Sequence, residues 1–189
     1  MFLKSAKKDR VQRLWERAVC FHGKPCPLLA LGVRVCDTAL AKLNIAEPEA
    51  DRLVCVSEHD GCCVDAIQAG LHCTAGGKHL LYYKTGRLIF TVYDLVSGDS
   101  VRVCAQPGLA ETVRTRRPQD ILSAPEEQLF YFEAAHPLTR HTLDKVSRAC
   151  GANPEGIPSR PAGVQDSPDQ FVSFDLPENV LGRPTRRRR

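Results

Sequence analysis

The sequence has no long apolar segment. No run of apolar residues approaches the roughly 20 that a helix needs to cross a bilayer. Residues 1–10 carry lysines, an arginine and an aspartate where a secretory signal peptide has its apolar region. These absences predict a cytoplasmic protein that does not cross a membrane.

The sequence also lacks any Cys-x-x-Cys pair, although it contains nine cysteines. This absence argues against a zinc ribbon and against a thioredoxin-type dithiol. The odd number of cysteines and the length of the chain argue against the disulfide framework of a small secreted protein. We therefore expect some cysteines to be buried thiols that act as small hydrophobic groups. The others are candidates for metal or redox chemistry.

Excess positive charge is confined to the C-terminal end. The formal net charge is +4, but five of the last seven residues are arginines, so the rest of the chain carries −1. A nucleic-acid-binding domain is expected to carry a clear basic excess, so the sequence argues against a nucleic acid partner. Blocks of like charge are usually solvated, so we predict that the arginine-rich C-terminal end is solvated. A weak contact with phosphate or with a partner is the alternative.

The remaining composition is that of a folded protein. With 189 residues, 43% hydrophobic and 25% charged, the chain suits one domain with a real core. Helical spacing of apolar residues predicts helices, and short runs of β-formers bounded by turn residues predict strands. The predicted elements are helices at 8–20 and 26–43, a strand at 53–56, a helix at 62–69, strands at 79–83, 87–95 and 100–106, and helices near 108–116, 126–134 and 139–150.

This order predicts an α+β fold. A four-stranded mixed sheet is expected to carry helices packed on it, followed by C-terminal helices and an extended tail. We expect residues 1–150 to form the α+β domain with its helical extension. Residues 151–189 are rich in Pro, Gly, Ser and Asp, so an extended, partly disordered tail is expected there.

A first group of chemically active side chains lies between the first two predicted helices. His22 and Cys26 are four residues apart in a loop of glycine and proline that leads directly into a helix. Exposed N–H groups and the positive end of the helix dipole favour a thiolate at a helix N-terminus. Cys26 could therefore be a nucleophile or a metal ligand. The alternative is a capping residue beside a loop histidine with no further role.

A second group surrounds the third predicted helix. Cys62 begins this helix, and Cys73 begins the glycine-rich loop that follows it. A helix and a turn could bring both ends to one side. Neighbouring thiols on a helix face different ways, so one of Cys62 and Cys63 is expected to pack inward. The alternative is that all three cysteines belong to the core.

Other polar residues near these groups have weaker patterns. Residues 74–78 lack the spacing of a phosphate-binding loop and precede a strand, so we reject a nucleotide site there. Asp65 and Gln68 are three apart on one helix and could support an imidazole through its second nitrogen, or simply cap and solvate the helix. The remaining cysteines are expected to be structural: Cys20, Cys36, Cys55, Cys104 and Cys150. Three histidines have no cluster around them and are expected at the surface: His59, His136 and His141.

Taken together, these motifs resemble the FmdE family of formylmethanofuran dehydrogenase subunits. The matching segments are Phe21-His22-Gly23-x-x-Cys26-Pro27, Leu31-Gly32-x-Arg34, Glu58-x-x-x-Cys62-x-x-Asp65-Ala66-Ile67-Gln68, Cys73-Thr74-x-Gly76-x-Lys78-x-Leu80 and Lys84-Thr85-Gly86-Arg87. The resemblance covers about residues 15–107, with a weaker extension at 123–132. The family takes its name from a molybdenum or tungsten enzyme of C1 metabolism, but many members have no established reaction.

The resemblance implies an α+β domain, a cleft lined by the histidine and cysteines of these motifs, a bound zinc or similar metal, and a homodimer. This chain departs from the family in two ways. Lys24 stands where the family usually has a second histidine, and an ammonium cannot ligate a metal. His79, where the family tends to have asparagine, could compensate. The C-terminal module with Cys-x-x-Cys pairs that many members carry is absent.

Our leading hypothesis is a metal-binding protein that is accessory to, or resembles, a subunit of a molybdenum C1 enzyme. Its metal is zinc, or another transition metal such as nickel. The expected metal ligands are His22, Cys62 and Cys73. Cys26 is a fourth ligand or a reactive thiolate, and it is assigned as a catalytic residue with Lys24. The expected supporting residues behind the ligands are Asp65, Gln68, Thr74 and His79.

The residues leave two alternatives to the metal-binding hypothesis. One is thiol redox or covalent chemistry, with Cys26 as the nucleophile and His22 as its base. The other is a non-catalytic subunit that docks onto a larger metalloenzyme. The sequence identifies neither a substrate nor a reaction.

Overall fold

Two helices begin the chain in the computed structural model, which describes residues 2–83 and 85–138. Helix α1 spans Phe2–His22 and helix α2 spans Pro27–Lys42. Gly23 has a positive φ of 85°, which suits glycine and ends α1. Proline at the first position of α2 has no N–H that would need a partner, so a new helix can begin there.

A five-stranded mixed sheet follows these helices. Its strands are β1 (Leu53–Ser57), β2 (Leu80–Tyr82), β3 (Ile89–Asp94), β4 (Ser100–Ala105) and β5 (Phe130–Glu133). Helix α3 (Cys63–Leu71) lies between β1 and β2 in the chain. The strand order is β2-β1-β3-β4-β5. Strand β1 is parallel to β2, and the other neighbouring pairs are antiparallel. Parallel pairing requires a crossover, which α3 supplies.

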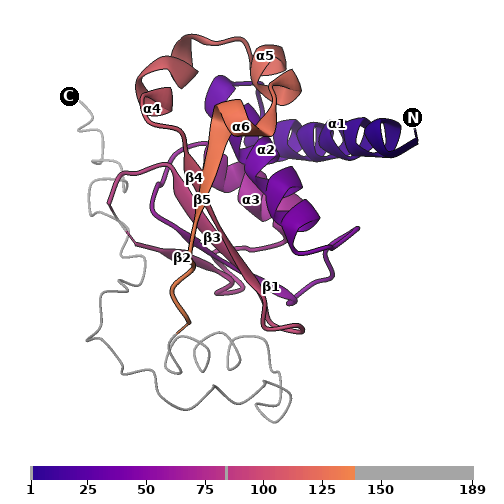
Figure 1. The fold of residues 1–189 in the computed structure, drawn as a ribbon, viewed down its shortest axis with the longest axis vertical. Coiled ribbons are helices and arrows are strands. Elements are labelled where there is room, and N and C mark those ends of the chain that lie inside the picture. Colours follow the sequence, from indigo (N-terminus) through magenta and orange to yellow (C-terminus); the bar gives the residue numbers. More distant parts are fainter. Residues whose placement is uncertain (1, 84, 139–189) are drawn as a thin grey trace, which may run out of the picture.

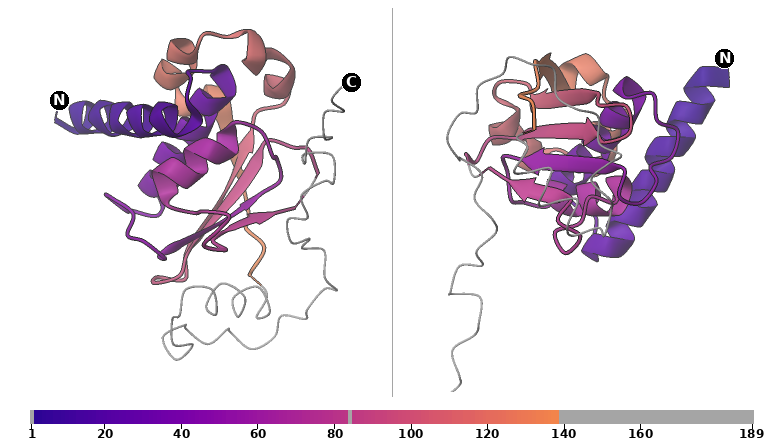
Figure 2. Two further views of the ribbon diagram at one scale, coloured as in Figure 1. Left: turned by 180° about the vertical axis from the view of Figure 1, so that it is seen from behind. Right: turned by 90° about the horizontal axis from the view of Figure 1, so that it is seen from below.

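Helices α1, α2 and α3 gather on one face of the sheet (Figure 1; Figure 2). Most of α2 is buried, including Leu29, Leu31 and Val35. These side chains join a single core with Ile67 from α3 and Phe90 from β3. A helix that is apolar nearly all round is expected in such a central position. The N-terminal ends of α2 and α3 are thereby fixed relative to each other.

Close packing between α2 and α3 depends on Gly32. A Cβ atom at this position would lie 2.6 Å from the carbonyl oxygen of Cys63 and 2.8 Å from the Cβ of Ala66. Only glycine allows this approach of the two backbones. The start of α3, where Cys62 lies, is consequently held against α2.

Arg34 ties α2 to the region after β4. Its Nη1 donates hydrogen bonds to the carbonyl oxygens of Ile121, Leu122 and Ala124 at 3.1, 2.9 and 2.6 Å. These carbonyls lie at the end of helix α5 (Pro118–Ser123), where no further turn of helix can bind them. A buried guanidinium thus serves as the C-terminal cap of another helix.

The predicted α+β class is confirmed, with one more strand than expected. A helix was predicted at 126–134, but helix α6 covers only Glu126–Leu129 and is followed by β5. The aromatic run that begins at Phe130 suits a strand, and it pairs with the open edge of β4. Tertiary pairing therefore prevailed over the helical pattern.

The segment between β4 and β5 also differs in detail from the prediction. The helix predicted near 108–116 consists of α4 (Leu109–Thr112) and a 3₁₀ turn, η1 (Val113–Thr115). Helix α5 was not predicted. The helix predicted at 139–150 and the tail predicted at 151–189 lie outside the described residues, so the domain boundary at residue 150 stays a prediction. Within the described part of the chain, no helix is long and apolar enough to cross a membrane.

Candidate metal centre

The loop between α1 and α2 places an imidazole beside a thiol. His22 is the last residue of α1, and Cys26 is the N-cap of α2, in an extended conformation. The Cys26 Sγ accepts a hydrogen bond from the backbone N–H of Leu29 at 3.3 Å. The His22 Nε2 lies 3.7 Å from this sulfur. The residue that caps the helix is therefore also the one that contacts the histidine.

Cys62 brings a second thiol to the same place from the start of α3. The imidazole of His22 and the thiols of Cys26 and Cys62 form one group, whose potential ligand atoms all lie within 4.8 Å of one another. All three residues are partly buried. In a tetrahedral zinc site, neighbouring ligand atoms lie about 3.5–3.8 Å apart, so only a small contraction would bring these atoms onto one ion.

Asp65 fixes the orientation of the histidine ring. The His22 Nδ1 lies 2.6 Å from the Asp65 Oδ2, one turn into α3. A carboxylate at this distance favours the tautomer that carries its proton on Nδ1. The Nε2 lone pair then faces the two sulfurs. Carboxylate support of this kind is typical of metal-binding histidines.

The thiols of Cys26 and Cys62 interact with each other. Burial raises the pKa of Cys62, and the hydrogen bond and charge of Cys26 raise it further. Negative charge on Cys26 would repel a thiolate on Cys62, so the protein alone favours the protonated form of Cys62. A bound cation would reverse this preference, because a metal deprotonates its thiol ligands.

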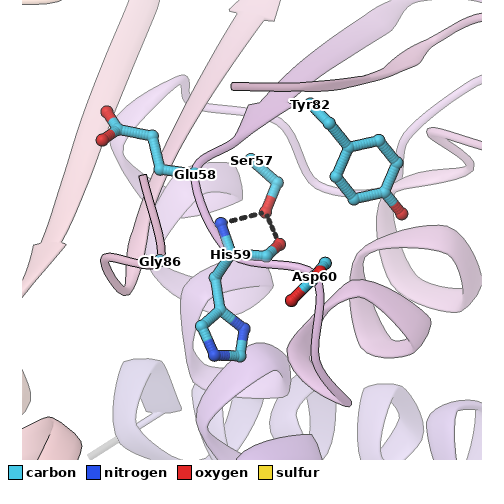
Figure 3. Close-up of a pocket in the computed structure, with 6 residues that line it drawn as sticks. All are labelled: Ser57, Glu58, His59, Asp60, Tyr82 and Gly86. Carbon is cyan, nitrogen blue, oxygen red and sulfur yellow. Dashed lines mark hydrogen bonds between the residues drawn. The ribbon is translucent and has the colours of Figure 1, made fainter. Parts of the chain in front are cut away.

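A small pocket lies at the C-terminal ends of β1 and β2 (Figure 3). Its volume is about 80 Å³, and it is lined by Ser57, Glu58, His59, Asp60, Tyr82 and Gly86. The segment from Ser57 to Asp60 leads directly to Cys62. The lining segment therefore ends two residues before Cys62.

Hydrogen bonds within this segment hold its shape. The Ser57 hydroxyl donates to the carbonyl oxygen of His59 at 2.5 Å and accepts from the N–H of His59 at 3.3 Å (Figure 3). The His59 Nδ1 accepts a hydrogen bond from the N–H of Gly61 at 2.9 Å. His59, which was expected at the surface, is half-buried.

Tyr82 links the pocket electrostatically to the histidine. Burial raises the pKa of Tyr82 to about 12, and the carboxylates of Asp65 and Asp60 contribute to the increase. The hydroxyl therefore keeps its proton at neutral pH and can donate a hydrogen bond. Because Asp65 also contacts His22, the pocket and the Cys/His group share a charged neighbour.

An ion-pair network surrounds the buried Glu58, which also lines the pocket. The Glu58 carboxylate accepts hydrogen bonds from Arg102 at 2.5 Å, from Arg87 at 2.7 Å and from the Thr85 hydroxyl at 2.7 Å. Burial alone would raise the pKa of Glu58, but these hydrogen bonds and the two arginine charges outweigh it and hold the pKa below its ordinary value. Arg102 also binds Glu133 on β5. Sequence reasoning noted Glu58 only as part of a motif, and it missed this network because the partners are far apart in the chain.

The expectation that Cys73 completes the group does not agree with the structure. Cys73 is buried and its Sγ donates to the carbonyl oxygen of Leu53 at 3.3 Å. Burial and the neighbouring thiols of Cys55 and Cys36 raise its pKa well above the ordinary value. The reason is the length of α3, because nine helical residues extend about 13 Å. The turn after α3 does not return the chain along the helix, so Cys73 stays at its far end.

Three other predicted supporting residues make contacts outside the group, and their supporting role stays a prediction. Gln68 accepts a hydrogen bond from the N–H of Ala75, and the Thr74 hydroxyl accepts one from the N–H of Gly77. His79 is buried, with its Nε2 3.7 Å from the carboxylate of Asp51. These contacts stabilise the loop after α3 rather than the ligands. Asp65 is the predicted supporting residue that contacts His22.

The other assigned residues are placed as follows. Lys24 is exposed in the loop before Cys26, and its catalytic assignment stays a prediction. Cys63 is buried and donates to the carbonyl oxygen of Leu28, so it is the inward-facing member of its pair. The cysteines expected to be structural divide into the buried Cys36, Cys55 and Cys104, the exposed Cys20, and Cys150, which lies outside the described residues. His136 is exposed as expected, and His141 lies outside the described residues.

Comparison with protein families gives one match over this region. Residues 21–134 match the sequence profile of the family described as FmdE, Molybdenum formylmethanofuran dehydrogenase operon. The match covers more than half of the chain and contains all the residues of the Cys/His group.

Two relatives add to this comparison. A protein of Archaeoglobus fulgidus named "Probable S-adenosyl-L-methionine-binding protein" is 32% identical over 117 residues, which are 60% of this chain and 31% of that protein. The chain therefore spans about a third of this relative. A crystal structure of a tungsten formylmethanofuran dehydrogenase FmdE-like protein from Syntrophus aciditrophicus matches with a TM-score of 0.50 and 22% identity. This match covers 71% of the present chain and 76% of the other, and it supports the fold.

Proposed function

Because the chain belongs to the FmdE family, we propose that it is a transition-metal-binding protein whose ligands are His22, Cys26 and Cys62. This ligand set replaces Cys73 of the sequence-based hypothesis by Cys26. The family's association with a molybdenum enzyme operon supports a role as an accessory to, or a relative of, a subunit of such a C1 enzyme.

The observation that carries this proposal is the convergence of three ligand atoms within 4.8 Å from three different helix ends. One nitrogen and two sulfur donors suit zinc, with nickel as the next choice. The carboxylate of Asp65 on the far nitrogen of His22 matches the support that zinc-binding histidines receive. With three protein ligands, a fourth position would remain open to water or substrate, as in catalytic zinc sites.

Metal content is the direct test. Full-length protein purified from medium with zinc or nickel is expected to hold about one equivalent of metal, measured by elemental analysis. The Cys62→Ala variant is expected to lose most of it, because only two ligands remain. Cys20→Ala is the matched control, since Cys20 is exposed on α1 and outside the group. Equal metal content in the Cys62 and Cys20 variants, or none in the parent protein, would contradict the proposal.

A second prediction concerns Asp65. Replacement by asparagine keeps the shape but removes the charge that orients and polarises His22. Metal affinity is expected to fall about 10–100-fold, measured by competition with a chelating dye. Gln68→Ala is a suitable control, because Gln68 lies on the same helix and binds the loop at Ala75 instead. A larger loss in the Gln68 variant than in Asp65→Asn would contradict the proposed role of Asp65.

One geometric observation favours a second candidate function. The 3.7 Å distance between the His22 Nε2 and the Cys26 Sγ also suits a nucleophilic thiol with an imidazole base. The metal experiment separates the two functions. A protein without metal whose Cys26 is alkylated much faster than Cys20 would support the nucleophile, and metal that protects Cys26 from alkylation would support the metal centre.

We also propose that the protein forms a homodimer in the cytoplasm and associates with a larger metalloenzyme. The operon context in the family description supports the association. Sedimentation of the purified protein tests whether it is a homodimer. Co-purification with a molybdenum or tungsten enzyme from the native cells tests the association with a larger metalloenzyme.

A further inference from the structure

Cys26 and Cys62 are far apart in the sequence, yet their sulfur atoms lie within 4.8 Å of each other. The absence of a Cys-x-x-Cys pair argued against a dithiol, but the fold creates one from two helix ends. We propose that Cys26 and Cys62 form a reversible dithiol–disulfide pair, and that the disulfide removes both sulfur ligands from the metal site. The second half of this inference rests on the proposed function, whereas the disulfide itself does not.

The local structure allows the two sulfurs to meet. A disulfide needs a bond of about 2.05 Å and Cβ atoms about 3.8 Å apart, so one side chain must turn toward the other. Cys62 makes no side-chain cap hydrogen bond to α3, so its rotation costs that helix nothing. Cys26 accepts the N–H of Leu29, contacts the His22 Nε2 at 3.7 Å and already shares a hydrogen bond with Cys62. The two residues precede separate helices, and the bond can form without breaking a turn of either.

Solvent access makes this pair distinct from most other cysteines. Cys26 and Cys62 are partly exposed, so a soluble oxidant can reach them. Five other cysteines are buried: Cys36, Cys55, Cys63, Cys73 and Cys104. Cys63, the neighbour of Cys62, is held inside by its hydrogen bond to Leu28. Cys20 is exposed, and it lies outside the group of His22, Cys26 and Cys62.

The reaction is a two-electron exchange with a low-molecular-mass disulfide such as oxidised glutathione. The Cys26 thiolate attacks one sulfur of glutathione disulfide, forms a mixed disulfide and releases one glutathione thiolate. The Cys62 thiolate then attacks the Cys26 sulfur and releases the second glutathione. The two protein sulfurs lose two electrons in total, and the glutathione disulfide gains them. Excess reduced glutathione reverses both steps. A metal ion held by the two thiolates dissociates when the disulfide forms, with no change in its own charge.

The disulfide is tested with metal-free, full-length protein in which Cys20 and Cys150 are replaced by serine. After incubation in oxidised glutathione, the intact mass is expected to fall by two hydrogens, and peptide mapping is expected to join the Cys26 and Cys62 peptides. Addition of the Cys62→Ser replacement is expected to give a glutathione adduct at Cys26 instead. Absence of the cross-linked peptide, with glutathione adducts on both residues in the parent background, would overturn the inference.

The consequence for metal is measured separately. Oxidised protein is expected to bind zinc more than about 100-fold more weakly than reduced protein, because a single protein ligand remains. Reduction should restore binding. Protein that binds metal when reduced but never forms the disulfide overturns this inference alone. Protein that forms the disulfide but binds no metal in either state overturns the proposed function and leaves the dithiol pair in place.

Discussion

Replacing Gly32 by alanine is expected to lower the free energy of unfolding by about 2–3 kcal/mol. The added Cβ would lie 2.6 Å from the carbonyl oxygen and 2.7 Å from the Cα of Cys63. Both are backbone atoms, so relief requires α3 to move away from α2 rather than a side chain to turn. Alanine favours a helix by about 1 kcal/mol over glycine, but this gain is smaller than the cost of the forced separation.

The same substitution should also weaken the metal site. Cys63 follows Cys62 directly, so a shift of α3 displaces one proposed ligand relative to Cys26. Denaturant unfolding gives the stability, and dye competition gives the metal affinity. Gly76→Ala is the matched control, because nothing lies within 4 Å of a Cβ placed there. If the two alanine variants were equally stable, the close contact between α2 and α3 would not be a constraint in solution.

Replacing Glu58 by glutamine is expected to cost about 3 kcal/mol. Glu58 is buried, and its carboxylate is paired with Arg102, which is also buried, and with Arg87. The amide keeps the size of the side chain but removes the charge, so the guanidinium of Arg102 loses its buried counter-charge. Glu133 remains bound to Arg102 from the partly exposed strand β5, which limits the loss.

The pH dependence of this effect has a definite sign. The pKa of Glu58 is lowered in the folded protein, so its carboxylate contributes stability above the ordinary value of 4.5. This contribution is lost as the pH falls through the lowered folded-state pKa. The stability difference between the parent protein and Glu58→Gln should therefore be full at neutral pH and shrink in acid. A stability difference that stayed constant from neutral to acidic pH would show that the charge of Glu58 does not cause it.

Glu133→Gln is the matched control for the network. Glu133 binds the same arginine but its side chain is 45% exposed, so solvent screens the pair and little stability should be lost. A similar loss in both variants would indicate that the anchoring of β5, rather than the buried pair with Glu58, dominates. Because Glu58 precedes the segment that leads to Cys62, the first variant should also lower metal affinity.

Much of the fold follows from local patterns. Helix α2 is predicted by the apolar spacing of Leu28, Leu31 and Val35 and by the proline at residue 27. Turn residues predict the hairpin between β3 and β4. The strand at Phe130 could not be read in this way, because four residues do not show a clear period. The unpaired edge of β4 decides that this segment is a strand.

The site was predictable in its residue types and only partly in its membership. His22, Cys26 and Cys62 all stand out because each lies where a helix ends or begins. Cys73 has a similar local setting at the other end of α3, so spacing alone could not separate it from Cys62. The direction and length of α3 in the fold make that distinction.

Local sequence is sufficient to predict most helices and strands, the histidine and cysteines at helix ends, and the motifs of the FmdE family, because each depends on neighbouring residues. Three features become visible only in the folded chain: which sulfurs lie near the imidazole, the contact of Asp65 with His22, and the pairing of Glu58 with two arginines. The physical reason is that these contacts depend on how α1, α2 and α3 pack against one another and against the sheet. That packing is set by the shape of the whole core, including the close approach at Gly32.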